Sequence, residues 1–288
     1  MKHLLNPLLP KIRIHSWGGF GSQLFTAMLV MKLQKYFSGR RLKVIVHTSG
    51  VTRREVEFDF SLLGVEAHQI DDFDERTKIN EHMANKYYRN LKIEFRFRQY
   101  VALILRQLGF VQDSNTDSSF NSIKPWTFAL RGHYSNLTFD RLMIRSLCEV
   151  LFTSQEFHSR PGSDIVIHYR LGDLLNLKEK SPINPERIAK VFEGLPTSQK
   201  APTLLSDSTL DQVESFISGS QFLEHAEIVN YDPVETLHIC TKAEVFIGTG
   251  AKISLWAALF RYFVYDKISF LPEGFMWATK MGLRAKWY

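Results

Sequence analysis

Four short segments of the chain carry polar residues of the types that bind phosphate groups or sugars. Each follows a stretch with the pattern of a buried strand and comes directly before a helical pattern. Open α/β sheets bind their ligands at the carboxyl ends of their strands. The four segments are residues 17–23, 168–173, 206–209 and 248–254.

The segment 168–173 is the strongest of the four candidates. His168 and Arg170 fall on the same face of the expected strand, and Gly172 and Asp173 follow it. A guanidinium offers a planar fork of donors that matches a diphosphate, so we expect Arg170 to contact a leaving diphosphate. His168 and Asp173 are the further catalytic candidates. The alternative is a buried histidine satisfied by the backbone beside an exposed arginine.

Two other segments supply groups suited to a nucleotide. Lys252 and Ser254 stand at the start of a helix, where backbone amides and a cation attract phosphate. Asp207 comes at the end of a strand, where it either binds a ribose or base edge or caps the next helix. We expect these three residues to contact the donor.

The segment 17–23 places three glycines between a strand and a helix. Glycine allows a tight turn, so amides at the helix start can face an anion or a sugar. Gly19, Gly21, Ser22 and Gln23 are therefore candidates for donor binding. The alternative is a plain turn with Ser22 as the helix cap. The spacing fits neither a dinucleotide fingerprint nor a P-loop.

Strand-like and helix-like segments alternate along the chain, which is typical of βα units around parallel sheets. The expected strands are 11–17, 44–46, 126–131, 164–170, 203–207, 227–230 and 245–248. The expected helices are 22–37, 80–108, 138–152, 185–192, 210–217, 233–241 and 252–262. A polar stretch at 153–163 separates the halves. We therefore expect two Rossmann-like domains, 1–155 and 156–288, with a cleft between them.

Composition is that of an ordinary globular protein. The chain has 288 residues, a net charge of +6 and 44% hydrophobic residues, which excludes wholesale disorder. Its two cysteines exclude a disulfide scaffold and fit a reducing compartment. No apolar run reaches membrane-spanning length, and residues 1–10 do not have a signal-peptide pattern. We expect a cytoplasmic protein whose basic excess favours acidic partners such as nucleotides.

Taken together, five boxes resemble those of the α-1,2-fucosyltransferases, glycosyltransferase family 11, and their order and spacing cover most of the chain. Residues 18–25 resemble the family's Gly-Gly-Leu-Gly-Asn-Gln-Met-Phe box, and residues 168–173 its His-x-Arg-x-Gly-Asp motif. Three further boxes of the family resemble residues 131–135, Ser206-Asp207 and residues 232–258. The His-x-Arg-x-Gly-Asp motif is shared in variant form with α-1,6- and protein O-fucosyltransferases.

The resemblance implies a GT-B fold, a GDP-β-L-fucose donor and an inverting transfer that needs no metal or other cofactor. The acceptor would be a galactoside-type hydroxyl on an oligosaccharide or lipid-linked glycan. The first domain would take the acceptor and the second the nucleotide sugar. Ser22, Leu171 and residues 250–253 differ from the family pattern. Two alternatives therefore stay open: another nucleotide-sugar donor, or a non-catalytic protein that binds a sugar or nucleotide.

The proton acceptor for the acceptor hydroxyl is not assigned by the sequence. Asp173 and Glu179 are the nearest acidic candidates to Arg170. Asp72-Phe73-Asp74 matches the bare Asp-x-Asp of metal-dependent transferases. It lies within an acidic run that is typical of a solvated loop, so no metal site is assigned.

Basic and aromatic residues are interleaved over 86–100. We interpret this stretch first as a core-facing helix whose cations reach solvent. The second interpretation is a peripheral membrane patch, which would hold the protein at the inner face of the membrane near a lipid-linked acceptor. A nucleic-acid surface is the third alternative, and nucleic acid is not expected as a partner.

Overall fold

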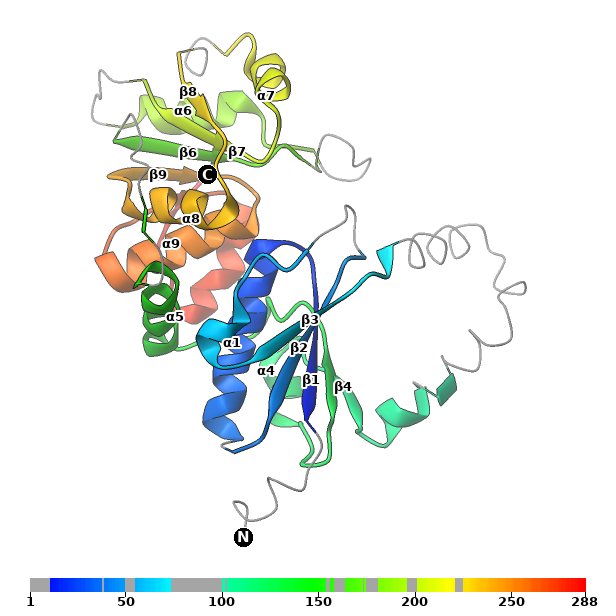
Figure 1. Ribbon diagram of the computed structural model, residues 1–288. Coiled ribbons are helices and arrows are strands. Elements are labelled where there is room, and N and C mark those ends of the chain that lie inside the picture. The colour runs from blue at the N-terminus through cyan, green and yellow to red at the C-terminus, as the bar shows by residue number, and fades with distance from the viewer. Residues whose placement is uncertain are drawn as a thin grey trace. The chain divides into compact units, whose positions relative to one another are not determined.

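The computed structural model describes residues 11–37, 39–49, 55–73, 100–101, 103–153, 156–157, 164–172, 174, 181–195, 201–220 and 225–288. The chain divides into two compact units, Met1–Thr138 and Phe139–Tyr288. Each unit is built on its own parallel sheet with helices beside it (Figure 1). The α/β class and the two parallel sheets predicted from the sequence are confirmed.

The first unit contains a five-stranded sheet in the order β3-β2-β1-β5-β4, and its pairings are parallel. Its elements are β1 (Ile12–Trp17), α1 (Phe20–Tyr36), β2 (Leu42–His47), η2 (Phe60–Leu63), β3 (Glu66–Ile70), β4 (Val111–Asp113), α4 (Asp117–Asn121) and β5 (Ala129–Arg131). Helix α1 packs on the face where Ile12, Ile14 and Val44 are fully buried (Figure 1). Because side chains alternate along a strand, His15 and Trp17 point to the opposite face.

The second unit contains a six-stranded parallel sheet in the order β11-β10-β9-β6-β7-β8. Its strands are β6 (Ile165–Tyr169), β7 (Thr203–Ser206), β8 (Glu227–Val229), β9 (Val245–Gly248), β10 (Phe270–Leu271) and β11 (Lys286–Trp287). Its helices are α5 (Arg141–Thr153), α6 (Pro185–Glu193), α7 (Leu210–Ile217), α8 (Pro233–Lys242), α9 (Lys252–Tyr265) and η5 (Glu273–Met281). Ile167, Tyr169 and Leu204 pack with apolar residues of α6 and α7 in one core. Helices α8 and α9 lie side by side and contact β6 and β9.

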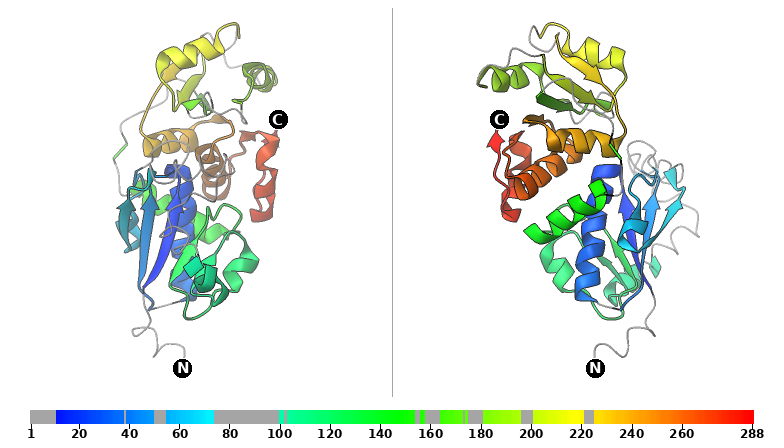
Figure 2. Two further views of the ribbon diagram at one scale, coloured as in Figure 1. Left: turned by 90° about the vertical axis from the view of Figure 1, so that its right-hand side faces the viewer. Right: turned by 60° about the vertical axis from the view of Figure 1, so that its left-hand side comes forward.

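The division between the units falls earlier in the chain than the boundary at 155/156 that the sequence suggests. Helix α5, which the sequence assigns to the first domain, packs against α9 within the second unit (Figure 2). The Arg145 guanidinium donates a hydrogen bond of 2.7 Å to the Phe263 carbonyl of α9. Within the described residues, no helix is long and apolar enough to cross a membrane.

Candidate functional site

Three strand ends meet at one edge of the second sheet. Strand β6 lies between β7 and β9, and His168 is in register with Leu205 of β7 and Gly248 of β9. The turns that follow these strands are therefore neighbours. This register brings together the segments 168–172, 206–209 and 248–254, as the sequence predicts.

Thr249 ties the turn after β6 to the turn after β9. The Arg170 amide donates to Thr249 Oγ1 over 2.9 Å, and this hydroxyl donates to the His168 carbonyl over 3.0 Å. The Arg170 guanidinium is half-buried and donates a long hydrogen bond, 3.4 Å, to the Gly250 carbonyl. Thr249 thus holds Arg170 beside the residues that begin α9.

His168 and Ser254 contact each other inside the unit. The two side chains are buried, and His168 Nδ1 lies 2.7 Å from Ser254 Oγ. Burial, opposed by Asp207 and assisted by Arg170, lowers the pKa of His168 to about 4. The imidazole is therefore neutral at neutral pH. Both residues position α9 against β6, a role distinct from the ligand contact expected of them.

Asp207 clamps the turn that follows β6. Its Oδ1 accepts hydrogen bonds from the amides of Leu171 and Gly172, at 2.9 and 3.0 Å. A Cβ at position 172 would lie 2.7 Å from Asp207 Oδ2, so this turn requires glycine. Helix α7 begins instead with a capping box from Thr209. The carboxylate is exposed but is already used by the turn.

Helix α9 begins beside Arg170 without a side-chain cap. Lys252 is its first residue, and the preceding Ala251 offers no capping atom. The first turn of α9 contains no acidic residue. The other helices α5, α6 and α8 are capped by Asp140, Asn184 and Asp232. A helix N-terminus flanked by an arginine and a lysine attracts an anion. Asp173 and Glu179 lie outside the described residues.

The glycine-rich segment 17–23, called the glycine box below, is hydrogen-bonded to other residues of the first unit. Gly18 has a φ of +93°, which favours glycine, and Gly19 is the N-cap of α1. The Phe20 amide, at the helix start, donates a short hydrogen bond to the Glu57 carboxylate. This carboxylate occupies the place where an anionic ligand would bind, next to the expected donor contacts Gly21 and Ser22.

The side-chain amide of Gln23 makes all of its hydrogen bonds to residues of the first unit. Its Nε2 donates to the carbonyls of Gly18 and Glu55, at 3.2 and 2.7 Å. Its Oε1 accepts from the amides of Glu57 and Phe58, at 2.9 and 3.0 Å. Two donors and two acceptor positions are all that a glutamine amide has. Gln23 therefore holds residues 55–58 against α1 and keeps no capacity for a donor nucleotide.

Three ionisable side chains form a hydrogen-bonded chain at the carboxyl end of the first sheet, and no local sequence pattern marks them. His15 Nδ1 lies 2.8 Å from His47 Nε2, and His47 Nδ1 lies 2.8 Å from Asp72 Oδ2. The Trp17 ring stacks on His47 with centroids 4.5 Å apart. The hydroxyl of the buried Tyr134 reaches the His15 carbonyl at 2.6 Å. The box 131–135 thus fixes the backbone of β1.

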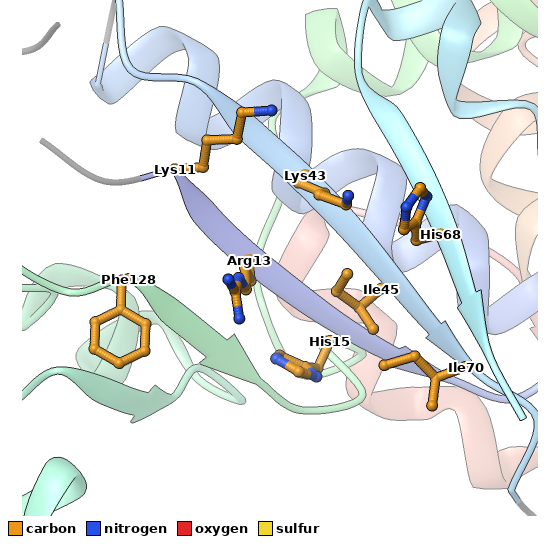
Figure 3. Close-up of a pocket in the computed structure, with 8 residues that line it drawn as sticks. All are labelled: Lys11, Arg13, His15, Lys43, Ile45, His68, Ile70 and Phe128. Carbon is orange, nitrogen blue, oxygen red and sulfur yellow. The ribbon is translucent and has the colours of Figure 1, made fainter. Parts of the chain in front are cut away.

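His15 also lines a hollow of about 590 Å³ on the sheet face opposite α1 (Figure 3). The lining combines cationic and apolar side chains from four neighbouring strands and their flanks: Lys11, Arg13, His15, Lys43, Ile45, His68, Ile70 and Phe128. Glu66 pairs with Lys11 and Lys43, at 3.8 and 3.4 Å. The hollow has the size of a small-molecule site.

Asp72 is engaged by His47 and by the Ser49 amide, which donates to its Oδ1 over 3.0 Å. Asp74 of the Asp-x-Asp match lies outside the described residues. Across the described ranges, no group of three or more His, Cys, Asp or Glu side chains is arranged to hold a metal. The basic and aromatic residues of 86–99 also lie outside them, and Tyr100 at the end of that stretch is exposed.

Comparison with known proteins gives structural likenesses only. No family model and no curated protein matches the sequence. The structure is similar to E. coli heptosyltransferase WaaC with ADP, at 9% identity over 96% of this chain and 91% of that one, with a TM-score of 0.46. It is also similar to fucosyltransferase NodZ from Bradyrhizobium (14% identity, 86% and 92% covered, TM-score 0.38). A third match is a family 9 glycosyl transferase from Veillonella parvula (8% identity, 97% and 86% covered, TM-score 0.39).

Proposed function

We propose that the protein is a glycosyltransferase of the GT-B type that transfers L-fucose from GDP-β-L-fucose to a galactoside-type hydroxyl. The reaction inverts the anomeric centre and uses no metal. The second unit binds the nucleotide sugar, and the first takes the acceptor, an oligosaccharide or a lipid-linked glycan at the cytoplasmic face of a membrane. The choice of GDP-fucose rests on the resemblance of the five sequence boxes.

One observation carries the proposal: an arginine and a lysine flank the uncapped N-terminus of α9 at the carboxyl edge of the second sheet. The bond from the anomeric carbon to the diphosphate breaks as the acceptor oxygen attacks, and negative charge develops on the leaving group. Preorganised cations and backbone amides stabilise such charge most in the transition state. Arg170 contacts the diphosphate, with Lys252 and the first amides of α9 beside it.

The other residues expected at the site position Arg170 and helix α9. Thr249 fixes the Arg170 backbone, and the buried pair His168 and Ser254 sets the distance between β6 and α9. A Cβ at Gly248 would lie 2.7 Å from the Ser254 Cβ, so glycine there permits the close approach of the helix. Asp207 shapes the turn that presents the edge of the site.

Nucleotide binding and donor cleavage test the proposal. GDP and GDP-fucose should raise the melting temperature in EDTA, and UDP, CMP and dTDP should not, because a ligand stabilises only the state that binds it. Arg170→Ala should lower GDP-fucose turnover roughly 10²- to 10³-fold. Arg170→Lys should restore part of it, because an ammonium keeps the charge without the planar fork.

The matched control is Arg284→Ala, which removes an exposed arginine of the same unit. Its turnover and melting temperature should stay close to those of the wild type. Stabilisation by UDP-sugars in place of GDP would overturn the fucose donor. An Arg170→Ala protein with wild-type turnover would overturn the assigned diphosphate contact.

A further inference from the structure

We propose that Tyr288 is a positioning residue of the donor site, and that its hydroxyl fixes the turn from which Arg170 and helix α9 contact the diphosphate. The inference rests on the proposed function, because it concerns how that same site is held for the donor. It gives a role to a residue outside the five sequence boxes, which end at residue 258. Tyr288 directly follows β11 and belongs to the second unit.

The hydroxyl of Tyr288 reaches the carboxyl end of β9. Its Oη donates a hydrogen bond of 2.9 Å to the carbonyl of Gly248, which is the last residue of that strand. Burial raises the pKa of Tyr288, so the hydroxyl keeps the proton that it donates at neutral pH. A side chain 40 residues further along the chain therefore holds the backbone at the point where the donor turn begins.

Strand β10 ends beside Gly248. It pairs with β9 through Phe270 and Ile247 and has Leu271 as its last residue. Pro272 follows, and a proline has no amide hydrogen with which to extend the ladder. Gly248 is buried, so its carbonyl requires a hydrogen-bond donor from the protein. Tyr288 supplies that donor.

Hydrogen bonds lead from this point to Arg170. Thr249 follows Gly248, and its hydroxyl accepts from the Arg170 amide over 2.9 Å. The Arg170 guanidinium donates to the Gly250 carbonyl over 3.4 Å, and α9 begins two residues later. A shift of the Gly248 carbonyl would therefore displace the guanidinium and the first amides of α9 together. These are the groups that the proposed function assigns to the diphosphate.

The rest of Tyr288 is held by contacts that do not involve its hydroxyl. Its backbone amide donates to the Leu271 carbonyl over 3.0 Å, and its carbonyl accepts from the Glu273 amide over 3.1 Å. The ring packs against the core between the sheet and helices α6 and α7. The Arg187 guanidinium lies over the ring, 5.8 Å from its centroid. Removal of the hydroxyl alone therefore separates a positioning role from a role in folding.

Tyr288→Phe removes the hydroxyl and keeps the ring. GDP affinity is measured by calorimetry in EDTA, at a temperature where the variant is folded, and turnover is measured as GDP release from GDP-fucose. We expect the dissociation constant for GDP to rise about tenfold and turnover to fall about tenfold, because a displaced contact stabilises the leaving diphosphate less.

The matched control is Tyr265→Phe. Tyr265 is also half-buried, and its hydroxyl also makes a hydrogen bond within the second unit, accepting from Lys242 Nζ over 2.7 Å. It is the last residue of α9, about 20 Å from the start of that helix. The control variant should keep the GDP affinity and turnover of the wild type.

A double-mutant cycle with Arg170→Ala tests whether Tyr288 acts through the turn. In the Arg170→Ala background, Tyr288→Phe should lower turnover by less than about threefold, because the contact that it positions has already been removed. A merely structural role predicts the same roughly tenfold loss in both backgrounds. Such additivity would overturn the proposal.

Amide hydrogen exchange measures the turn without any ligand. Tyr288→Phe should speed the exchange of amides 249–253, and Tyr265→Phe should leave their exchange unchanged. Faster exchange throughout the second unit would overturn the proposal, because the hydroxyl would then support the whole fold.

The outcomes separate the two levels of inference. A Tyr288→Phe protein with the GDP affinity and turnover of the wild type would overturn the positioning role and leave the proposed function standing. A wild-type protein that neither binds GDP nor releases it from GDP-fucose would overturn the proposed function, and the role of Tyr288 with it.

Discussion

Replacing Gln23 with leucine removes four hydrogen bonds from the first unit while keeping the side-chain volume nearly the same. The side chain is fully buried, so water cannot take the place of the lost amide. The substitution leaves the amides of Glu57 and Phe58 without their acceptor. It also removes the donors to the Gly18 and Glu55 carbonyls.

The four partners do not contribute equally. Phe58 is buried and Glu57 half-buried, so their amides lose an acceptor where solvent has little access. Each buried donor left unsatisfied costs about 1–3 kcal/mol. The Glu55 carbonyl belongs to an exposed residue and can accept from water instead. We therefore expect Gln23→Leu to lower the free energy of unfolding by about 3 kcal/mol, partly offset by the apolar gain of leucine.

The matched control is Gln34→Leu in the same helix. Gln34 is exposed and makes one hydrogen bond, 2.8 Å from its Nε2 to the Leu63 carbonyl. Its replacement should change stability by no more than about 0.5 kcal/mol. Urea unfolding followed by tryptophan fluorescence and far-UV circular dichroism measures both variants. At temperatures where the Gln23→Leu variant is folded, GDP should stabilise it as much as it stabilises the wild type, because the Gln23 amide contacts no donor nucleotide.

Small and equal losses of unfolding free energy in Gln23→Leu and Gln34→Leu would refute a structural role for the Gln23 amide in the glycine box. A Gln23→Leu protein of wild-type stability that no longer responds to GDP would refute it more directly. That result would return Gln23 to the nucleotide site, as the sequence first suggests.

Two further predictions concern the second unit. Arg261 is fully buried in α9, and its guanidinium donates hydrogen bonds to the Thr241 and Glu244 carbonyls at 3.3 and 3.0 Å. Arg261→Met should therefore lower the free energy of unfolding by about 3 kcal/mol in urea titrations. A loss below about 1 kcal/mol would contradict this prediction. Burial lowers the pKa of His168 from 6.5 to about 4, so stability should be complete above pH 6.5 and fall as the pH drops toward 4, by up to about 3 kcal/mol. His168→Asn should flatten this pH dependence, and an unchanged profile would show that His168 is not the group responsible.

The sequence predicts the buried elements of the second unit closely. The expected strand 164–170 is β6, and the expected helix 210–217 has the bounds of α7. Continuous apolar runs and capping residues identify such elements without knowledge of the tertiary structure. Strand β3 is missed because it is an edge strand with an exposed, largely polar sequence, and β4 because it has only three residues.

The site is predicted only in part, because its contacts depend on register. Strand ends can be located in a sequence, and the convergence of the turns after β6, β7 and β9 is confirmed by the pairing of those strands. The contact between His15 and His47 spans 32 residues and depends on parallel strands aligned to one residue. No local pattern marks such a pair. The roles expected of Gln23 and Asp207 differ from the structure for the same reason, since partners far along the chain occupy their polar atoms.

The topology of the first sheet also governs the order in which the unit can form during synthesis. Strand β1 lies between β2 and β5, and Arg13 pairs with Ala129 near the end of the unit. At ribosomal speeds the second partner, Ala129, follows the first, Lys43, by roughly 4–17 s. Until then β1 has one open edge, and its apolar face is covered by α1 alone. A nascent chain that stops before Ala129 therefore presents an incomplete sheet to chaperones and proteases, although the first strand and helix have already been made.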